Sequence, residues 1–224
     1  MNSNGTLIVI EGLDGSGKST QTGLLADWLT AREISVRRLK FPDYDSKSST
    51  LVQMYLNGEL GGIQDVNLYA ASSFYAADRY ISFVTGWRQD YEAGAVMLCD
   101  RYTTSNLIYQ MAKLPRQEWT SYMDWLWDFE FTRMGLPQPD KVLYLDMQPE
   151  TSRALLEKRY RENGGQMDIH EESIAYLLQC REAALFAAQR LGWTILRCCD
   201  GRQPLPIEAI FQLITDKIKE IIKL

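Results

Sequence analysis

Residues 12–20 read GLDGSGKST and directly follow the apolar run TLIVI at 6–10. Gly12, Gly17, Lys18 and Ser19 match the spacing G-x-x-x-x-G-K-[ST] of a phosphate-binding loop. Glycines allow consecutive backbone N–H groups to turn toward a phosphate, and the N-terminus of the following helix adds partial positive charge. The lysine can reach the β- and γ-phosphates, and the serine hydroxyl can bind Mg²⁺. We expect the loop to bind a nucleoside triphosphate through Gly12, Leu13, Asp14, Gly15, Ser16, Gly17, Lys18, Ser19 and Thr20.

The loop alone leaves the reaction open, because GTPases, motor ATPases and small-molecule kinases all share it. A GTPase should also carry an N-K-x-D motif, which this sequence lacks. Motor ATPases usually occupy larger chains. A small kinase needs a second site for the phosphate acceptor, with basic and aromatic residues at the ends of strands.

Three stretches supply residues of this kind: KFPDY at 40–44, SFYAADRY at 73–80 and DRYTTSNLIYQ at 100–110. Asp100 ends an apolar run, where a carboxylate can hold Mg²⁺ as a Walker-B aspartate does. Asp146 ends another such run and competes for this role. We favour Asp100 because Arg101 and Tyr102 follow it, whereas the residues after Asp146 indicate the start of a helix.

Five runs predict the strands that position these residues: 6–11, 34–41, 95–100, 141–146 and 193–198. Most are nearly continuous in apolar residues, which is typical of strands covered on both faces. Helical patterns lie between and around them at 18–32, 65–92, 117–134, 149–163, 171–191 and 204–223. This alternation predicts an α/β fold, with a parallel five-stranded sheet and helices on both faces. Ligands of such sheets bind at the carboxyl ends of the strands.

The composition fits one globular domain over residues 1–224, with 46% hydrophobic and 24% charged residues. A formal net charge of −5 argues against a general nucleic-acid binder. No stretch approaches the roughly 18 apolar residues of a membrane span, and the N-terminus does not resemble a signal peptide. The four cysteines show no C-x-x-C spacing, so we expect reduced thiols in a cytoplasmic protein without membrane or nucleic-acid partners.

In their order and spacing, IEGLDGSGKST, FPDY, FYAADR and DRYTTSNLIYQ resemble the thymidylate kinase (dTMP kinase) family. Residues 167–193 are similar to the segment that follows the lid in this family, so the resemblance covers nearly the whole chain. It implies a P-loop NTPase fold, transfer of the γ-phosphate of ATP to dTMP with Mg²⁺, and a homodimer. Glycine at position 15 and a basic lid resemble the bacterial type.

The resemblance also implies roles for individual residues. Tyr75 matches the aromatic residue that stacks on thymine, and Arg79 the arginine that bonds the base. Asn106 falls where some bacterial members contact the pyrimidine ring, and Tyr109 falls under the deoxyribose. The other implied substrate contacts are Asp14 near the 3′-hydroxyl, Tyr44 and Arg101 at the acceptor phosphate, and Phe41, Pro42, Ser105, Asp168 and Glu171.

The lid is expected at about 153–170, where EKRYRENGG supplies Lys158, Arg159 and Arg161. Relatives with glycine in the loop deliver mobile positive charge from the lid, so Arg159 and Arg161 join Lys18, Asp14 and Arg101 as expected catalytic residues. A solvated, basic helix end is the alternative interpretation of this stretch.

The chain departs from many relatives at position 43, where it has aspartate instead of arginine. Kinases for another pyrimidine nucleotide or a deoxynucleoside remain open as alternatives, as does a catalytically silent nucleotide-binding protein. Tyr75 could instead pack in the core, Arg101 could be a structural partner of Asp100, and Asn106 and Tyr109 could cap and pack a short helix.

Overall fold

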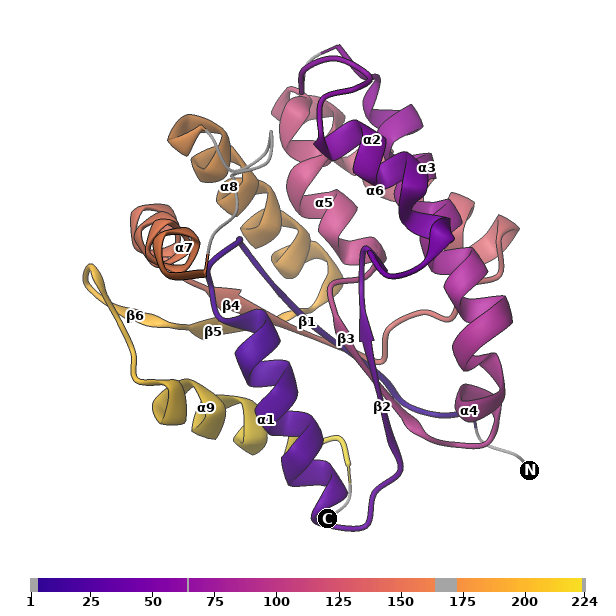
Figure 1. The fold of residues 1–224 in the computed structure, drawn as a ribbon, viewed down its shortest axis with the longest axis vertical. Helices are drawn as coiled ribbons and strands as arrows, with labels where there is room; N and C mark the ends of the chain where they lie inside the picture. The colour runs from indigo at the N-terminus through magenta and orange to yellow at the C-terminus, as the bar shows by residue number, and fades with distance from the viewer. Residues whose placement is uncertain (1–3, 64, 164–172, 223–224) are drawn as a thin grey trace.

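The central sheet of the protein consists of five parallel strands (Figure 1). They are β1 Leu7–Gly12, β2 Val36–Lys40, β3 Val96–Asp100, β4 Lys141–Asp146 and β5 Thr194–Arg197. Their order in the sheet is β2–β3–β1–β4–β5, with Ile8 of β1 opposite Leu98 of β3 and Lys141 of β4. The computed structural model describes residues 4–63, 65–163 and 173–222. The predicted parallel five-stranded sheet is confirmed.

Nine α-helices and several short helical turns lie in the described part of the chain. The α-helices are α1 Lys18–Thr30, α2 Thr50–Leu56, α3 Leu68–Ser82, α4 Arg88–Glu92, α5 Asn106–Tyr109, α6 Trp119–Trp127, α7 Pro149–Asn163, α8 Ile174–Leu191 and α9 Ile207–Lys219. The 3₁₀ turns are Lys47–Ser49, Thr103–Ser105, Met111–Lys113 and Arg116–Glu118, and the π turns are Phe83–Trp87 and Asp128–Arg133. Polar caps define some ends: Asn67 accepts from the first N–H groups of α3, and Ser173 caps α8.

Helices cover both faces of the sheet (Figure 1). On one face, α1 and α9 pack on strand residues such as Ile8 and Leu98. On the other face, the layer that contains α5, α6 and α8 packs on residues such as Val9 and Met97. Because successive residues of a strand point to opposite faces, the continuous apolar runs fill both cores at once.

Three helix limits differ from the sequence prediction. The helix expected over 65–92 begins at Leu68, and the π turn Phe83–Trp87 divides it from α4. The helix expected over 117–134 changes to π geometry after Trp127. The last helix begins at Ile207, because Pro204 belongs to a small antiparallel hairpin of β6 Cys199–Asp200 and β7 Gln203–Pro204. The sequence analysis predicted neither this hairpin nor α2.

The four cysteines are free, as expected from the sequence. Cys99, Cys180 and Cys198 are buried, whereas Cys199 at the start of the hairpin is partly exposed. Over the described residues, we find no helix with the length and apolar character needed to cross a membrane.

Candidate active site

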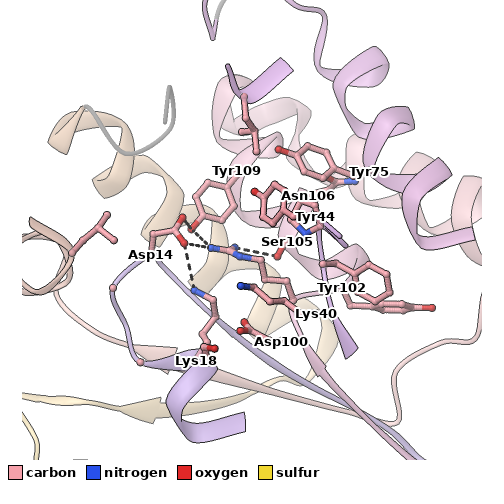
Figure 2. Close-up of a pocket in the computed structure, with 18 of the residues that line it drawn as sticks. Asp14, Lys18, Lys40, Tyr44, Tyr75, Asp100, Tyr102, Ser105, Asn106 and Tyr109 are labelled. Carbon is pink, nitrogen blue, oxygen red and sulfur yellow. Dashed lines mark hydrogen bonds and ion pairs between the residues drawn. The ribbon is translucent and has the colours of Figure 1, made fainter. Parts of the chain in front are cut away.

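A pocket of about 410 Å³ opens at the carboxyl ends of β1, β2 and β3 (Figure 2). Its wall combines the glycine loop and the start of α1 with segments after β2 and β3, parts of α2 and α3, and α7. The loop and all three stretches assigned to a second site therefore meet in one cavity. The predicted residues that line it are Asp14, Gly15, Gly17, Lys18, Ser19, Thr20, Phe41, Pro42, Tyr44, Tyr75, Arg79, Asp100, Arg101, Ser105, Asn106, Tyr109 and Arg159.

Four of the predicted residues that the structure describes do not line this pocket. Gly12, Leu13 and Ser16 belong to the loop but are buried. Arg161 belongs to α7 but does not line the pocket, and its Nε donates to the Glu157 carbonyl oxygen at 3.3 Å. Asp168 and Glu171 lie outside the described residues, as does the second part of the expected lid.

The glycine loop leaves the N-terminus of α1 open to the pocket. Gly15 and Gly17 adopt φ angles of 83° and 88°, which favour glycine, and no side chain caps the helix at Gly17. The first N–H groups of α1 thus face the pocket with the positive end of the helix dipole. The Lys18 ammonium donates to the Leu13 carbonyl at 2.9 Å and lies 3.8 Å from Asp14 Oδ1. Burial, together with the neighbouring Arg101, lowers the pKa of Lys18.

Asp14 joins the loop to the segment after β3 (Figure 2). Arg101 donates to Asp14 Oδ1, and the Tyr109 hydroxyl donates to Asp14 Oδ2 at 3.0 Å. A second Arg101 nitrogen donates to Ser105 Oγ at 3.4 Å. Burial alone would raise the pKa of Asp14, but Arg101, Lys18 and Tyr109 hold it well below its usual range. Asp14 is therefore ionised, and its charge is paired with that of Arg101.

Glu11 is a structural anchor that the sequence analysis did not single out. It is fully buried at the end of β1 and accepts hydrogen bonds from Thr104 Oγ1 at 2.7 Å and Ser105 Oγ at 2.8 Å. Burial raises its pKa, which Arg101 and these hydroxyls oppose. The bonds tie the segment after β3 to β1 and thereby fix the backbone that carries Arg101, whose φ is 72°.

A second buried acid, Glu130, organises the side of the pocket assigned to the base. It lies in the π turn after α6 and accepts from Arg79 Nε at 2.7 Å and Nη2 at 2.5 Å. Thr103 Oγ1 donates to it at 2.6 Å and Asn106 Nδ2 at 3.4 Å. Both members of the ion pair are almost completely buried. Burial opposes the charge of Arg79, but Glu130 outweighs this effect and raises its pKa.

Gln110 also lines the pocket and is fully buried. Among the described residues, neither atom of its amide has a hydrogen-bond partner. An amide offers a donor and an acceptor side by side, which suits the polar edge of a base. The sequence analysis quoted this residue within DRYTTSNLIYQ without assigning it a role.

A lysine supports the aromatic side of the pocket, which Tyr75 lines opposite the loop. Tyr75 of α3 contacts the ring edge of Tyr55 in α2, with ring centroids 6.3 Å apart. Lys113 Nζ donates to the Tyr55 hydroxyl at 2.7 Å. Burial lowers the pKa of Lys113 to about 8. Tyr75 lines the pocket. Tyr55 and Lys113, which the sequence analysis did not single out, support it.

Helix α7 closes the pocket on the side of the loop. Leu155, Leu156, Arg159 and Tyr160 line the cavity. The first turn of α7 packs so closely on the loop that a Cβ atom at Gly15 would lie 2.1 Å from the Ser152 carbonyl oxygen. A larger side chain in the loop would therefore displace α7.

The two candidate Walker-B residues differ in their surroundings. Asp100 lines the pocket, and its carboxylate makes no hydrogen bond or ion pair within the described residues. Asp146 instead accepts two hydrogen bonds from Arg181 of α8, at 2.7 and 2.9 Å. This geometry favours Asp100 over Asp146 as the residue near a nucleotide-bound metal.

A loop for a nucleoside triphosphate that opens into the same cavity as an aromatic and cationic second site defines a P-loop nucleoside monophosphate kinase, an ATP-dependent phosphotransferase. Comparison with known proteins agrees. A family model described as "Thymidylate kinase" matches residues 10–201. Thymidylate kinase from Mycobacterium tuberculosis is 31% identical over 190 residues, which cover 84% of this chain and 87% of the relative. The chain belongs to the thymidylate kinase family.

Two further similarities extend over more of the chain. Thymidylate kinase from Arabidopsis thaliana is 28% identical over 96% of this chain and 73% of its own length. The solved structure of thymidylate kinase from Candida albicans superimposes with a TM-score of 0.70, covering 97% of this chain and 92% of that chain. At 24% sequence identity, this likeness supports the fold alone.

Proposed function

We propose that the protein transfers the γ-phosphate of ATP to dTMP, giving dTDP and ADP. The observation that carries the proposal is the single pocket in which the phosphate-binding loop faces Tyr75, Arg79 and Arg101. Membership of the thymidylate kinase family supports dTMP as the acceptor. We infer that the protein is a cytoplasmic homodimer. The free cysteines fit a reducing compartment, and the dimer follows from the family resemblance alone.

On the donor side, residues 12–20 would hold the phosphates of ATP, with Lys18 against the β- and γ-phosphates. Ser19 and Asp100 offer the oxygen atoms that Mg²⁺ prefers, and both line the pocket. Mg²⁺ would neutralise charge on the phosphates during transfer. The open N-terminus of α1 and the absence of an ion pair at Asp100 within the described residues both fit this arrangement.

On the acceptor side, Tyr75 would stack on the base while Arg79 and Asn106 face its polar edge. Asp14 and Tyr109 would meet the sugar, and Arg101 with Tyr44 the phosphate. Phe41, Pro42 and Ser105 would complete the wall. The acceptor phosphate is already largely ionised at neutral pH, so the reaction needs no general base. Catalysis then depends on alignment of the two phosphates and on neutralisation of the transferred charge.

Helix α7 with the residues after it would serve as the lid, and Arg159 would bring positive charge to the transferred phosphoryl group. An arginine in this role can accelerate phosphoryl transfer by roughly 10³–10⁵. Arg159 lines the pocket and is the better placed of the two lid arginines.

An acceptor panel tests the proposal. ADP release should be measured with ATP, Mg²⁺ and each of dTMP, dUMP, dCMP and thymidine. We expect dTMP to give the highest kcat/KM and Lys18→Ala to abolish turnover in a folded protein. A higher kcat/KM for another acceptor would reassign the substrate, and ATP binding without turnover of any acceptor would identify a silent nucleotide-binding protein.

A further inference from the structure

Lys40 is a cation of the pocket that the sequence analysis quoted in KFPDY but did not assign. It is the last residue of β2, and its Cα lies opposite that of Asp100 in β3. The neighbouring Leu39 packs toward the core on the α8 side, whereas Arg38 lies beside Gly23 of α1. Since side chains alternate along a strand, Lys40 shares the face of Arg38, toward the N-terminus of α1. Figure 2 shows Lys40, Lys18 and Asp100 around the same part of the pocket.

The other cations that line the pocket already have partners. Lys18 and Arg101 contact Asp14, and Arg79 is held by Glu130. Arg159 lies over the ring of Tyr160. Within the described residues, Lys40 alone among these five cations makes no hydrogen bond, ion pair or ring contact.

An acceptor phosphate on this side of the pocket would require positive charge from the wall. A phosphate monoester carries about −1.5 to −2 charge at pH 7. Arg101 faces the site, but Asp14 already offsets its charge. Asp43 follows Phe41 and Pro42 of the wall in sequence, carries a negative charge and does not itself line the pocket. Within the described residues, Lys40 is therefore the cation of this wall that makes no ion pair, although the Asp100 carboxylate lies on the neighbouring strand.

We propose that Lys40 binds the phosphate of the acceptor nucleotide. This inference rests on the proposed transfer to a nucleoside monophosphate. The ammonium offers three N–H donors and a compact charge at the end of a flexible chain, which suits a phosphate dianion. Lys40 ends β2, and its neighbour β3 carries Asp100 and leads directly to Arg101. The side chain of Lys40 therefore borders the part of the pocket where an acceptor phosphate held by Arg101 would sit.

Binding of dTMP and thymidine to Lys40→Met, measured by calorimetry without ATP, tests the proposal. The two ligands differ only in the phosphate. Loss of Lys40 should therefore lower the affinity for dTMP about tenfold and change the affinity for thymidine by less than about twofold. Lys40→Arg should retain most of the affinity for dTMP. Lys47→Met is the matched control, because Lys47 is an exposed lysine of the next turn that does not line the pocket.

Three results would overturn the proposal. An equal loss of affinity for dTMP and thymidine would mean that Lys40 only supports the wall of the pocket. Unchanged affinity for both would mean that Lys40 does not contact the acceptor. A rise in the KM for ATP without a change in dTMP affinity would assign it to the donor. Turnover of dTMP by the unsubstituted protein is measured separately, so a failure of the proposed function is distinguishable from a failure at Lys40.

Discussion

Arg159 and Arg161 show how two residues of the same type and nearly the same position in sequence separate in space. Arg159 lines the pocket, whereas Arg161 lies on α7 outside it and bonds the helix backbone. Arg159→Ala should lower kcat by at least about tenfold at saturating ATP and dTMP, because the transferred charge loses a partner. Arg161→Ala should change kcat by less than about threefold. Steady-state kinetics of both variants check this, and the reverse order would move the catalytic arginine to Arg161.

Glu130 has no predicted role, yet it fixes Arg79, Thr103 and Asn106 together. Glu130→Gln keeps the size of the side chain but leaves a buried guanidinium unpaired, which should cost about 3 kcal/mol of unfolding free energy. Urea unfolding measures the loss. Glu182→Gln is the control, since Glu182 pairs with Arg116 on the surface, where such a change should cost less than about 1 kcal/mol. Similar losses in both variants would contradict a special role for the buried pair.

At the scale of elements, the glycine loop and α7 constrain each other. Gly15→Ala would place a Cβ against the Ser152 carbonyl in a backbone conformation that already disfavours alanine. Gly135 has a similar φ of 69° and open space around it, so Gly135→Ala carries the backbone cost without the clash. Gly15→Ala should therefore destabilise the protein by about 1–3 kcal/mol more than Gly135→Ala. Thermal unfolding compares the two, and equal effects would mean that α7 yields without cost.

The elements also show what a sequence reveals about this protein. Four of the five strands were predictable because they form nearly continuous apolar runs bounded by polar residues. β2, with the mixed sequence VRRLK, carries a weaker signal. Helix α2 and the β6–β7 hairpin are too short for their hydrophobic residues to show a clear periodicity in the sequence. The π turn at Phe83–Trp87 depends on packing rather than on the local pattern.

The residues of the candidate site also fall into those that the sequence predicts and those that it does not. The loop and the three flanking stretches carry local patterns, and the structure brings them together. Glu11, Glu130 and Gln110 could not be assigned, because their partners or surroundings come from distant parts of the chain. For Glu11, a signal was visible in the sequence, because it is a single acid within an apolar strand. Lys40 was visible too, but only the pocket distinguishes it from a surface lysine.

The stability of the whole molecule should depend on the state of Lys113. Its folded pKa of about 8 lies below the ordinary value near 10.4, so the folded state releases the proton first. Between about pH 8 and 10.4 the unfolded chain binds more protons, and the free energy of unfolding gains a contribution that rises with pH. Relative to Lys113→Met, the natural protein should gain about 1–3 kcal/mol from pH 7 to 10.

Urea unfolding of both proteins at several pH values measures this difference. The comparison with Lys113→Met removes the contributions of titrating groups that do not contact Lys113, which excludes Tyr55, the acceptor of its hydrogen bond. A constant difference across the range would show that Lys113 keeps an ordinary pKa in the folded state.

The β6–β7 hairpin, which precedes α9, contains a cysteine to which a fluorescent dye could be attached. Cys199 is partly exposed, while burial raises the pKa of the thiols of Cys99, Cys180 and Cys198. A maleimide at neutral pH should therefore label Cys199 selectively. The same hairpin contacts α7, because Thr151 donates to the Arg202 carbonyl at 3.0 Å. A dye at Cys199 would thus report movement of α7 as each substrate binds, by a change in emission and without any engineered cysteine.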